Sequence, residues 1–62
     1  MDALRKALAS LPEQQRECWV LREVGGLSYD EIAEQLSVPV PTVRGRIARA
    51  RETLTRELEG WR

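Results

Sequence analysis

The arginines near the C-terminal end of the chain are the residues whose type and spacing best suit a chemical role. Four of the eight residues from Arg44 to Arg51 are arginine, and none of the eight is acidic. The guanidinium group is planar and pairs bidentately with a phosphate or with the O6 and N7 atoms of guanine. Residues 42–62 carry six basic and three acidic residues, whereas residues 1–41 carry four basic and seven acidic ones. Such a local excess of positive charge attracts a polyanion even though the whole chain has no net charge.

Other chemistries are excluded by what the sequence lacks. It contains no histidine and a single cysteine, Cys18, so neither a histidine base nor a Cys/His zinc site can be assembled. No nucleophile and base stand at a catalytic spacing, and we therefore expect no enzyme and no cofactor. Cys18 is expected to be a small buried hydrophobic residue. No apolar run approaches the ~18 residues that cross a bilayer, and no signal peptide is apparent, which predicts a cytoplasmic protein without a membrane partner.

The elements that position these arginines are predicted from apolar spacing in a chain of 62 residues, enough for one small domain. We expect helices near 2–10, from about 12 to 24, from 28 to near 37, and from 42 to about 59, with no strand. The predicted inward-facing residues are Leu4, Ala7, Leu8, Leu11, Cys18, Leu21, Val24, Ile32, Ala33 and Leu36, followed on the last helix by Val43, Ile47, Ala50, Leu54, Leu58 and Trp61.

Helix ends are marked by residues with known local preferences. Gly25 and Gly26 should end the second helix, since glycine readily takes the left-handed conformation found at helix C-termini. Ser28 and Glu31 have the spacing of a capping box, in which each side chain accepts a hydrogen bond from the other residue's backbone N–H. This box predicts the start of the third helix, which should be about ten residues long.

Two prolines mark the connection between the third and fourth helices. Pro39 and Pro41 can each occupy the first turn of a helix, where a missing N–H costs little. Pro41 also disfavours helical angles at Val40, so the helical pattern is strong only from Thr42 onward. A capped helix, a tight turn and a basic helix form a helix-turn-helix pattern. The predicted fold is all-α: a small four-helix domain whose long C-terminal helix is the recognition helix.

Around the fourth helix, small residues lie opposite the apolar stripe and arginines flank them on both sides. The N-terminal residues of a recognition helix lie nearest the base edges in the major groove. The small residues therefore permit a close approach, the flanking arginines reach bases, and the arginines nearer the stripe meet phosphates. The predicted base-reading residues are Arg44, Gly45, Ala48 and Arg49, and the predicted phosphate-contacting arginines are Arg46 and Arg51.

The order of motifs along the chain resembles region 4 of bacterial sigma factors, most closely the extracytoplasmic-function group. The resemblance covers about residues 8–56. It implies a four-helix domain that binds the −35 element of double-stranded promoter DNA and joins RNA polymerase through the flap of the β subunit. In this family an anti-sigma factor often masks these surfaces. The motifs that carry the resemblance are Leu11-Pro12, Arg16, Leu21, Gly26–Ala33 (GLSYDEIA), Val38-Pro39 and Thr42–Arg51 (TVRGRIARAR).

The same resemblance implies that Ser28, Tyr29 and Thr42 lie against the DNA backbone. Pro41 stands where the family usually has glycine, and Gly45 stands where it commonly has serine. Ala48 replaces a residue that is often bulkier. These departures concern the base sequence that is read rather than the mode of binding. Because the family's region for the −10 element is absent, we expect a C-terminal fragment of a longer sigma factor, monomeric in isolation.

Two other functions remain open at this point. A LuxR-type response-regulator output domain shares the four-helix layout, and a stable dimer through the last helix would favour it. A protein-interaction module without DNA binding would show no salt-dependent affinity for DNA. Trp19 lies one step off the inner stripe and fits either a half-buried position or a partner surface. Leu58 and Trp61 either pack on Leu4 and Leu8 or dock on polymerase or an anti-sigma protein, and we expect packing within the domain.

Overall fold

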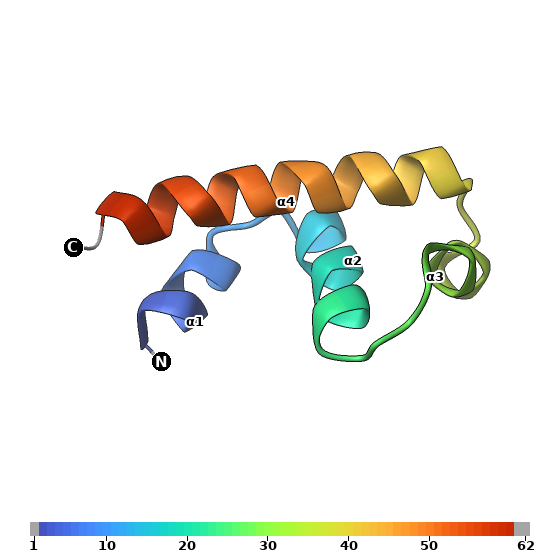
Figure 1. The fold of residues 1–62 in the computed structure, drawn as a ribbon, viewed down its shortest axis with the longest axis horizontal. Helices are drawn as coiled ribbons and strands as arrows, with labels where there is room; N and C mark the ends of the chain where they lie inside the picture. Colours follow the sequence, from blue (N-terminus) through green and yellow to red (C-terminus); the bar gives the residue numbers. More distant parts are fainter. Residues whose placement is uncertain (1, 61–62) are drawn as a thin grey trace.

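The computed structural model describes residues 2–60, which form four helices and, within that range, no strand (Figure 1). The predicted all-α class and the predicted helix-turn-helix are confirmed. Helix α3 has eight residues rather than the expected ten or so. The helices are α1 (Asp2–Ala9), α2 (Glu13–Glu23), α3 (Tyr29–Leu36) and α4 (Val40–Gly60).

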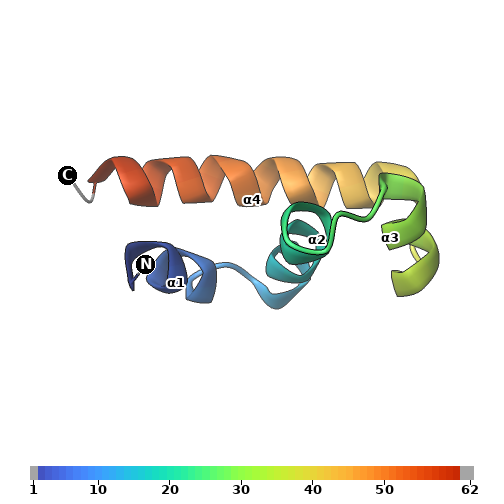
Figure 2. The same ribbon diagram turned by 60° about the horizontal axis from the view of Figure 1, so that its bottom comes forward.

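Helix α4 is the element against which the others pack. It has 21 residues and makes contacts with α1, α2 and α3. Figures 1 and 2 show α3 beside the start of α4, α2 beside its middle and α1 beside its C-terminal half. All three lie on one side of α4, and no described element covers the opposite side in Figure 1. Helix α4 therefore has a buried stripe on one side and, along the same length, a side that no other described helix covers.

Two clusters of buried residues hold the helices together. The first joins α2, α3 and α4 through Cys18, Ile32, Ala33, Val43 and Ile47, of which Cys18, Ile32 and Val43 are fully buried. Burying such side chains stabilises the folded state by about 1.5–3 kcal/mol for each large aliphatic residue. Cys18 is therefore a buried apolar residue, as predicted. This cluster fixes α3 against the start of α4, where the candidate site lies.

The second cluster joins α1 to the later turns of α4. Its buried members are Ala7 and Leu11 on one side and Ala50 and Leu54 on the other. Three half-buried residues pack against them: Leu8, Trp19 and Leu58. Leu58 thus packs within the domain, as predicted, against the same cluster as Leu8, and Trp19 is half-buried there too. Trp61, predicted to extend the stripe, lies outside the described residues.

Val24 is not part of the core. Its side chain is 74% exposed, so its predicted inward orientation is wrong. Cys18, Leu21 and Val24 are spaced by three residues, and each such step rotates the side chain by about 60° around a helix of 3.6 residues per turn. Val24 therefore lies about 120° away from the fully buried Cys18, beyond the stripe that α4 covers.

The paired glycines end α2 as predicted. Gly26 has a φ of 71°, in the left-handed region, and the N–H of Leu27 donates to the carbonyl oxygen of Leu21 at 3.1 Å. A Cβ atom at Gly25 would lie 2.7 Å from that same carbonyl oxygen. The chain can reverse here because neither position carries a side chain.

We expect Gly26→Ala to lower the free energy of unfolding by about 1–2 kcal/mol, because alanine is strained at positive φ. Gly45→Ala is the matched control. Gly45 lies within α4, and a Cβ atom there would meet nothing within 4 Å. Gly45→Ala should raise the free energy of unfolding by about 0.5–1 kcal/mol. Urea unfolding of the two variants measures both effects, and a change of the same sign in both would contradict this explanation.

Candidate DNA-binding surface

The turn between α3 and α4 is fixed by backbone hydrogen bonds. Ser37 ends α3 in the left-handed conformation, with φ 58° and ψ 45°, and its N–H donates to the carbonyl oxygens of Ala33 and Glu34. The N–H of Val38 also donates to the carbonyl oxygen of Ala33, at 3.0 Å. The connection from Ser37 to Pro39 is therefore short and hydrogen-bonded, which holds α3 and α4 in one arrangement.

Helix α4 begins at Val40, two residues before the strongly helical pattern predicted from Thr42. The carbonyl oxygen of Pro39 accepts the N–H of Thr42 at 3.0 Å and that of Val43 at 3.3 Å. Pro41 is the second residue of the helix, where an N–H has no partner within the helix and its loss costs little. The expected effect of Pro41 on Val40 is overridden, since the half-buried Val40 packs against the first cluster.

Gly45, Ala48 and Arg49 of the predicted base-reading set lie away from the buried stripe of α4, whereas Arg44 lies at the edge of that stripe, next to Tyr29 of α3. Arg44, Ala48 and Arg49 are exposed, and Gly45 is half-buried with open space where a Cβ atom would be. Among residues 2–60, no acidic side chain forms an ion pair with Arg44 or Arg49. Two free guanidinium groups therefore flank two small residues within the first three turns of the helix. These two arginines can bind the phosphates or base edges of a nucleic acid without first breaking an ion pair within the domain.

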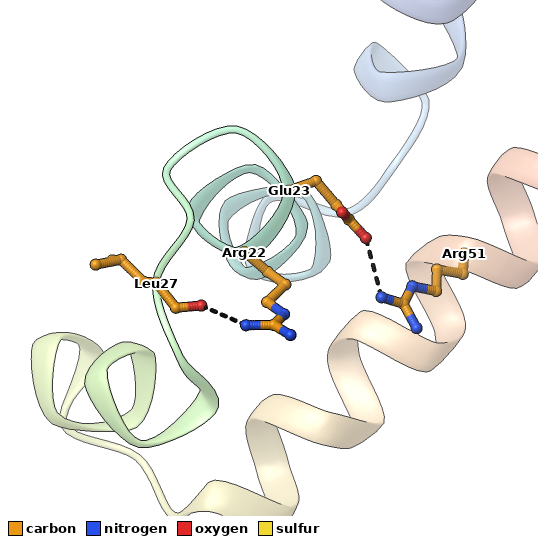
Figure 3. A network of polar contacts seen from close by, with 4 residues as sticks. All are labelled: Arg22, Glu23, Leu27 and Arg51. Atoms are coloured by element: carbon orange, nitrogen blue, oxygen red, sulfur yellow. Dashed lines mark hydrogen bonds and ion pairs between the residues drawn. The ribbon is translucent and has the colours of Figure 1, made fainter.

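The predicted phosphate-contacting residues of α4 differ in their surroundings. Thr42 and Arg46 are half-buried. Arg51 is exposed and donates from Nη2 to Oε1 of Glu23 on α2, at 2.9 Å (Figure 3). The hydrogen bond with Glu23 raises the pKa of Arg51, and the nearby Tyr29 phenol acts in the same direction. Arg51 thus forms an internal ion pair, whereas Arg44 and Arg49 form none within residues 2–60.

The start of α3 is fixed by the predicted capping box. The N–H of Ser28 donates to Oε1 of Glu31 at 2.8 Å, and the N–H of Glu31 donates to Oγ of Ser28 at 3.1 Å. The hydrogen bond from the Ser28 backbone N–H lowers the pKa of the Glu31 carboxyl, and the Ser28 hydroxyl acts in the same direction. Ser28 is exposed and Tyr29 is half-buried against the first cluster.

Two residues of this surface were not predicted as site residues. Arg22, in the last turn of α2, donates from Nη1 to the carbonyl oxygen of Leu27 at 3.0 Å (Figure 3). Its guanidinium carbon lies 5.0 Å from the centre of the Tyr29 ring, and that of Arg44 lies 5.7 Å from the same centre. Glu23, the partner of Arg51, is the second. No local pattern connects Arg22 with the Tyr29 ring or Glu23 with Arg51, because each of these contacts joins α2 to another helix.

Metal binding and membrane insertion find no support in the described part of the chain. Residues 2–60 contain no group of three or more His, Cys, Asp or Glu side chains placed to hold a metal ion. None of the helices within this range is both long enough and apolar enough to span a bilayer.

Comparison with known proteins identifies the family. Residues 1–54 match the family model described as Sigma-70, region 4. The chain belongs to this family. The match favours the sigma-factor interpretation of the sequence over the LuxR-type alternative, and the helix-turn-helix of the region 4 domain is formed by α3 and α4.

The region 4 domain is also similar to individual sigma factors. It is 48% identical over 54 residues to the ECF RNA polymerase sigma-E factor of Escherichia coli K12, covering 87% of this chain and 28% of that protein. The sigma-E factor of Salmonella typhi gives the same values. The RNA polymerase sigma-H factor of Pseudomonas aeruginosa is 45% identical over 56 residues, or 90% of this chain and 29% of the relative. The chain thus spans little more than a quarter of the length of these relatives.

The capping box of the region 4 domain gives a stability prediction. We expect Ser28→Ala to lower the free energy of unfolding by about 1 kcal/mol, because the N–H of Glu31 loses its acceptor. In the folded chain the pKa of the Glu31 carboxyl is lower than its ordinary value of 4.5, because the Ser28 N–H donates to it. Its stabilising effect is therefore present above that value and is lost as the pH falls through the folded-state pKa.

Urea unfolding between about pH 5 and pH 3 measures this dependence. Glu31→Gln is the control, because glutamine keeps an acceptor for the N–H of Ser28 but does not titrate. It should show a weaker fall of stability over this interval than the unaltered chain. An identical fall in both proteins would show that the capping box is not the titrating element.

Proposed function

We propose that this region 4 domain binds the −35 element of double-stranded promoter DNA and tethers itself to core RNA polymerase during transcription initiation. The observation that carries the proposal is the exposed surface of the first three turns of α4, where Arg44 and Arg49 are free of ion pairs among the described residues. Membership of the Sigma-70 region 4 family supports it. The same arrangement on an unrelated helix-turn-helix would support DNA binding but not promoter recognition.

In this proposal the first turns of α4 enter the major groove. Arg44 and Arg49 pair with base edges, where arginine recognises guanine O6 and N7 bidentately. Gly45 and Ala48 allow the helix backbone to approach the groove floor because they add at most one methyl group. The exposure of Arg44, Ala48 and Arg49 supports this orientation, as does the side of α4 that no element within residues 2–60 covers in Figure 1.

Phosphates on the two walls of the groove are contacted by residues from both helices. Thr42 and Arg46 of α4 contact phosphates on one side of the groove. Ser28 and Tyr29, at the start of α3, contact phosphates on the other side. Arg51 reaches a phosphate by exchanging its bond with Glu23 for one with a phosphate oxygen. This exchange costs little, because the side chains are 53% and 39% exposed and an exposed ion pair contributes at most about 1 kcal/mol.

Further parts of the proposal concern partners. The domain contacts the flap of the polymerase β subunit, and an anti-sigma factor can cover the same surfaces. It is a monomer in isolation, forms the C-terminal part of a longer sigma factor, has no enzymatic activity, and acts in the cytoplasm with RNA polymerase. Gel filtration checks the oligomeric state: a stable dimer would contradict the proposed monomer.

The test of DNA binding selects bound duplexes from a random pool and then measures affinity for a selected and a scrambled duplex over a range of salt. We expect the selected duplexes to share one motif. The logarithm of the binding constant should fall linearly with the logarithm of salt concentration, by about 0.9 for each phosphate contact. Absence of a shared motif, or of any binding at low salt, would overturn the proposal.

Arg46→Ala tests the phosphate contacts separately from base reading. We expect this variant to weaken binding to the selected and the scrambled duplex by the same factor, because a phosphate carries no sequence information. The salt slope should become less steep by about 0.9, the value for one phosphate. Titrations of both duplexes at three or more salt concentrations provide the measurement. A loss confined to the selected duplex would assign Arg46 to base reading instead.

A further inference from the structure

The side chains around Tyr29 form a contact that none of the predicted DNA roles requires. The guanidinium carbons of Arg22 and Arg44 lie over the Tyr29 ring, 5.0 Å and 5.7 Å from its centre. These distances fall within the ~6 Å over which a cation is attracted by the face of an aromatic ring. Arg22 belongs to α2, Tyr29 to α3 and Arg44 to α4. One aromatic ring thus connects three helices beside the candidate DNA-binding surface.

The ring itself is held in place. Tyr29 is the first residue of α3 and directly follows Ser28, whose capping box fixes the start of that helix. Its side chain is half-buried and packs against the first cluster. Arg22 is held as well, since it donates to the carbonyl oxygen of Leu27 at 3.0 Å. Two of the three members therefore have positions that other contacts determine.

Arg44 is the member that lacks any other restraint. It is exposed, and within residues 2–60 its side chain forms neither a hydrogen bond nor an ion pair. An arginine side chain has many rotamers, and fixing one of them on binding opposes association. A preformed contact that selects one region of rotamer space reduces this cost.

We propose that the aromatic ring of Tyr29 is a positioning group for Arg44, which it holds beside the start of α4 in the orientation that meets DNA. The proposal rests on the DNA-binding function proposed above. It assigns the role to the ring, whereas the proposed phosphate contact of Tyr29 uses the hydroxyl group. Tyr29→Phe keeps the ring and removes the hydroxyl, and Tyr29→Leu removes both while keeping an apolar side chain for the core.

The first measurement requires no DNA. Protons above the face of an aromatic ring have NMR signals shifted upfield, so the δ protons of Arg44 should be shifted upfield from random-coil values in the unaltered chain. The shift should persist in Tyr29→Phe and disappear in Tyr29→Leu. Random-coil values in the unaltered chain would overturn the proposal, and this result does not depend on whether Tyr29→Leu folds.

The second measurement is affinity for the selected duplex in a double-mutant cycle. Tyr29→Leu should weaken binding by a further two- to fivefold relative to Tyr29→Phe, the effect of one exposed cation–π contact. This extra factor should vanish when Arg44 is already alanine. An equal loss in Tyr29→Phe and Tyr29→Leu, or an extra factor that persists in Arg44→Ala, would overturn the positioning role.

Thermal unfolding of each variant separates a folding defect from a positioning effect. A merely structural role of Tyr29 would lower the melting temperature without a dependence on Arg44. If the unaltered chain bound no duplex, the proposed function would fail, whereas the Arg44 shift would still report whether the ring holds this side chain. The two failures are therefore distinguishable.

Discussion

Arg49→Ala is expected to weaken binding of the selected −35 duplex by about 1–3 kcal/mol, or roughly 5- to 150-fold. Arg49 is exposed on the uncovered side of α4 and has no internal ion pair among residues 2–60, so the whole guanidinium group is available to a base. Its loss removes a bidentate contact and leaves a guanine edge without its donors. Binding to a scrambled duplex should change far less, because base pairing by Arg49 supplies specificity.

Arg56→Ala is the matched control for this variant. Arg56 is exposed on the same helix, seven residues or about two turns beyond Arg49, and so lies on nearly the same side. Both substitutions remove one positive charge and introduce the same helix-favouring residue. Arg56→Ala should therefore show only a small loss that is equal for selected and scrambled duplexes. Equal behaviour of the two variants on both duplexes would remove Arg49 from the base-reading set.

Ile47→Ala is expected to have the largest effect on folding. The Ile47 side chain is 1% exposed in the first cluster, and it comes from α4, the helix that all other helices contact. Truncating a buried isoleucine to alanine costs about 2–5 kcal/mol through lost burial and a residual cavity. A 62-residue domain has a total stability of only about 3–9 kcal/mol. The variant should be largely or wholly unfolded at moderate urea concentrations.

Two further variants bracket this result. Ile47→Val removes a single methylene group and should cost about 0.5–1.5 kcal/mol. Thr55 is exposed on the same helix, and Thr55→Ala should change the free energy of unfolding by no more than about 0.5 kcal/mol. Urea unfolding followed by circular dichroism gives all three values. A cost of Ile47→Ala close to that of Thr55→Ala would show that the first cluster does not stabilise the fold.

Local features of this fold were predictable because they depend on residues within about four positions of one another. The number and order of the helices, the capping box of Ser28 and Glu31, and the glycines after α2 are of this kind. The apolar stripe of α4 was also predictable, since a period of 3.6 residues places its members on one side. The exposed side that carries Arg44 and Arg49 then follows as the remainder of the same helix. Their roles in base reading remain predictions.

Other features arise only when the helices pack. The partners Glu23 and Arg51 are 28 residues apart, and Arg22, Tyr29 and Arg44 come from three different helices. Whether such side chains meet depends on how each helix is rotated and tilted against its neighbours, and no local pattern specifies that rotation. The exposure of Val24 and the start of α4 at Val40 have the same origin, because both follow from which surfaces the core covers. Local sequence thus places arginines on one side of a helix, and packing determines which of them are free to bind.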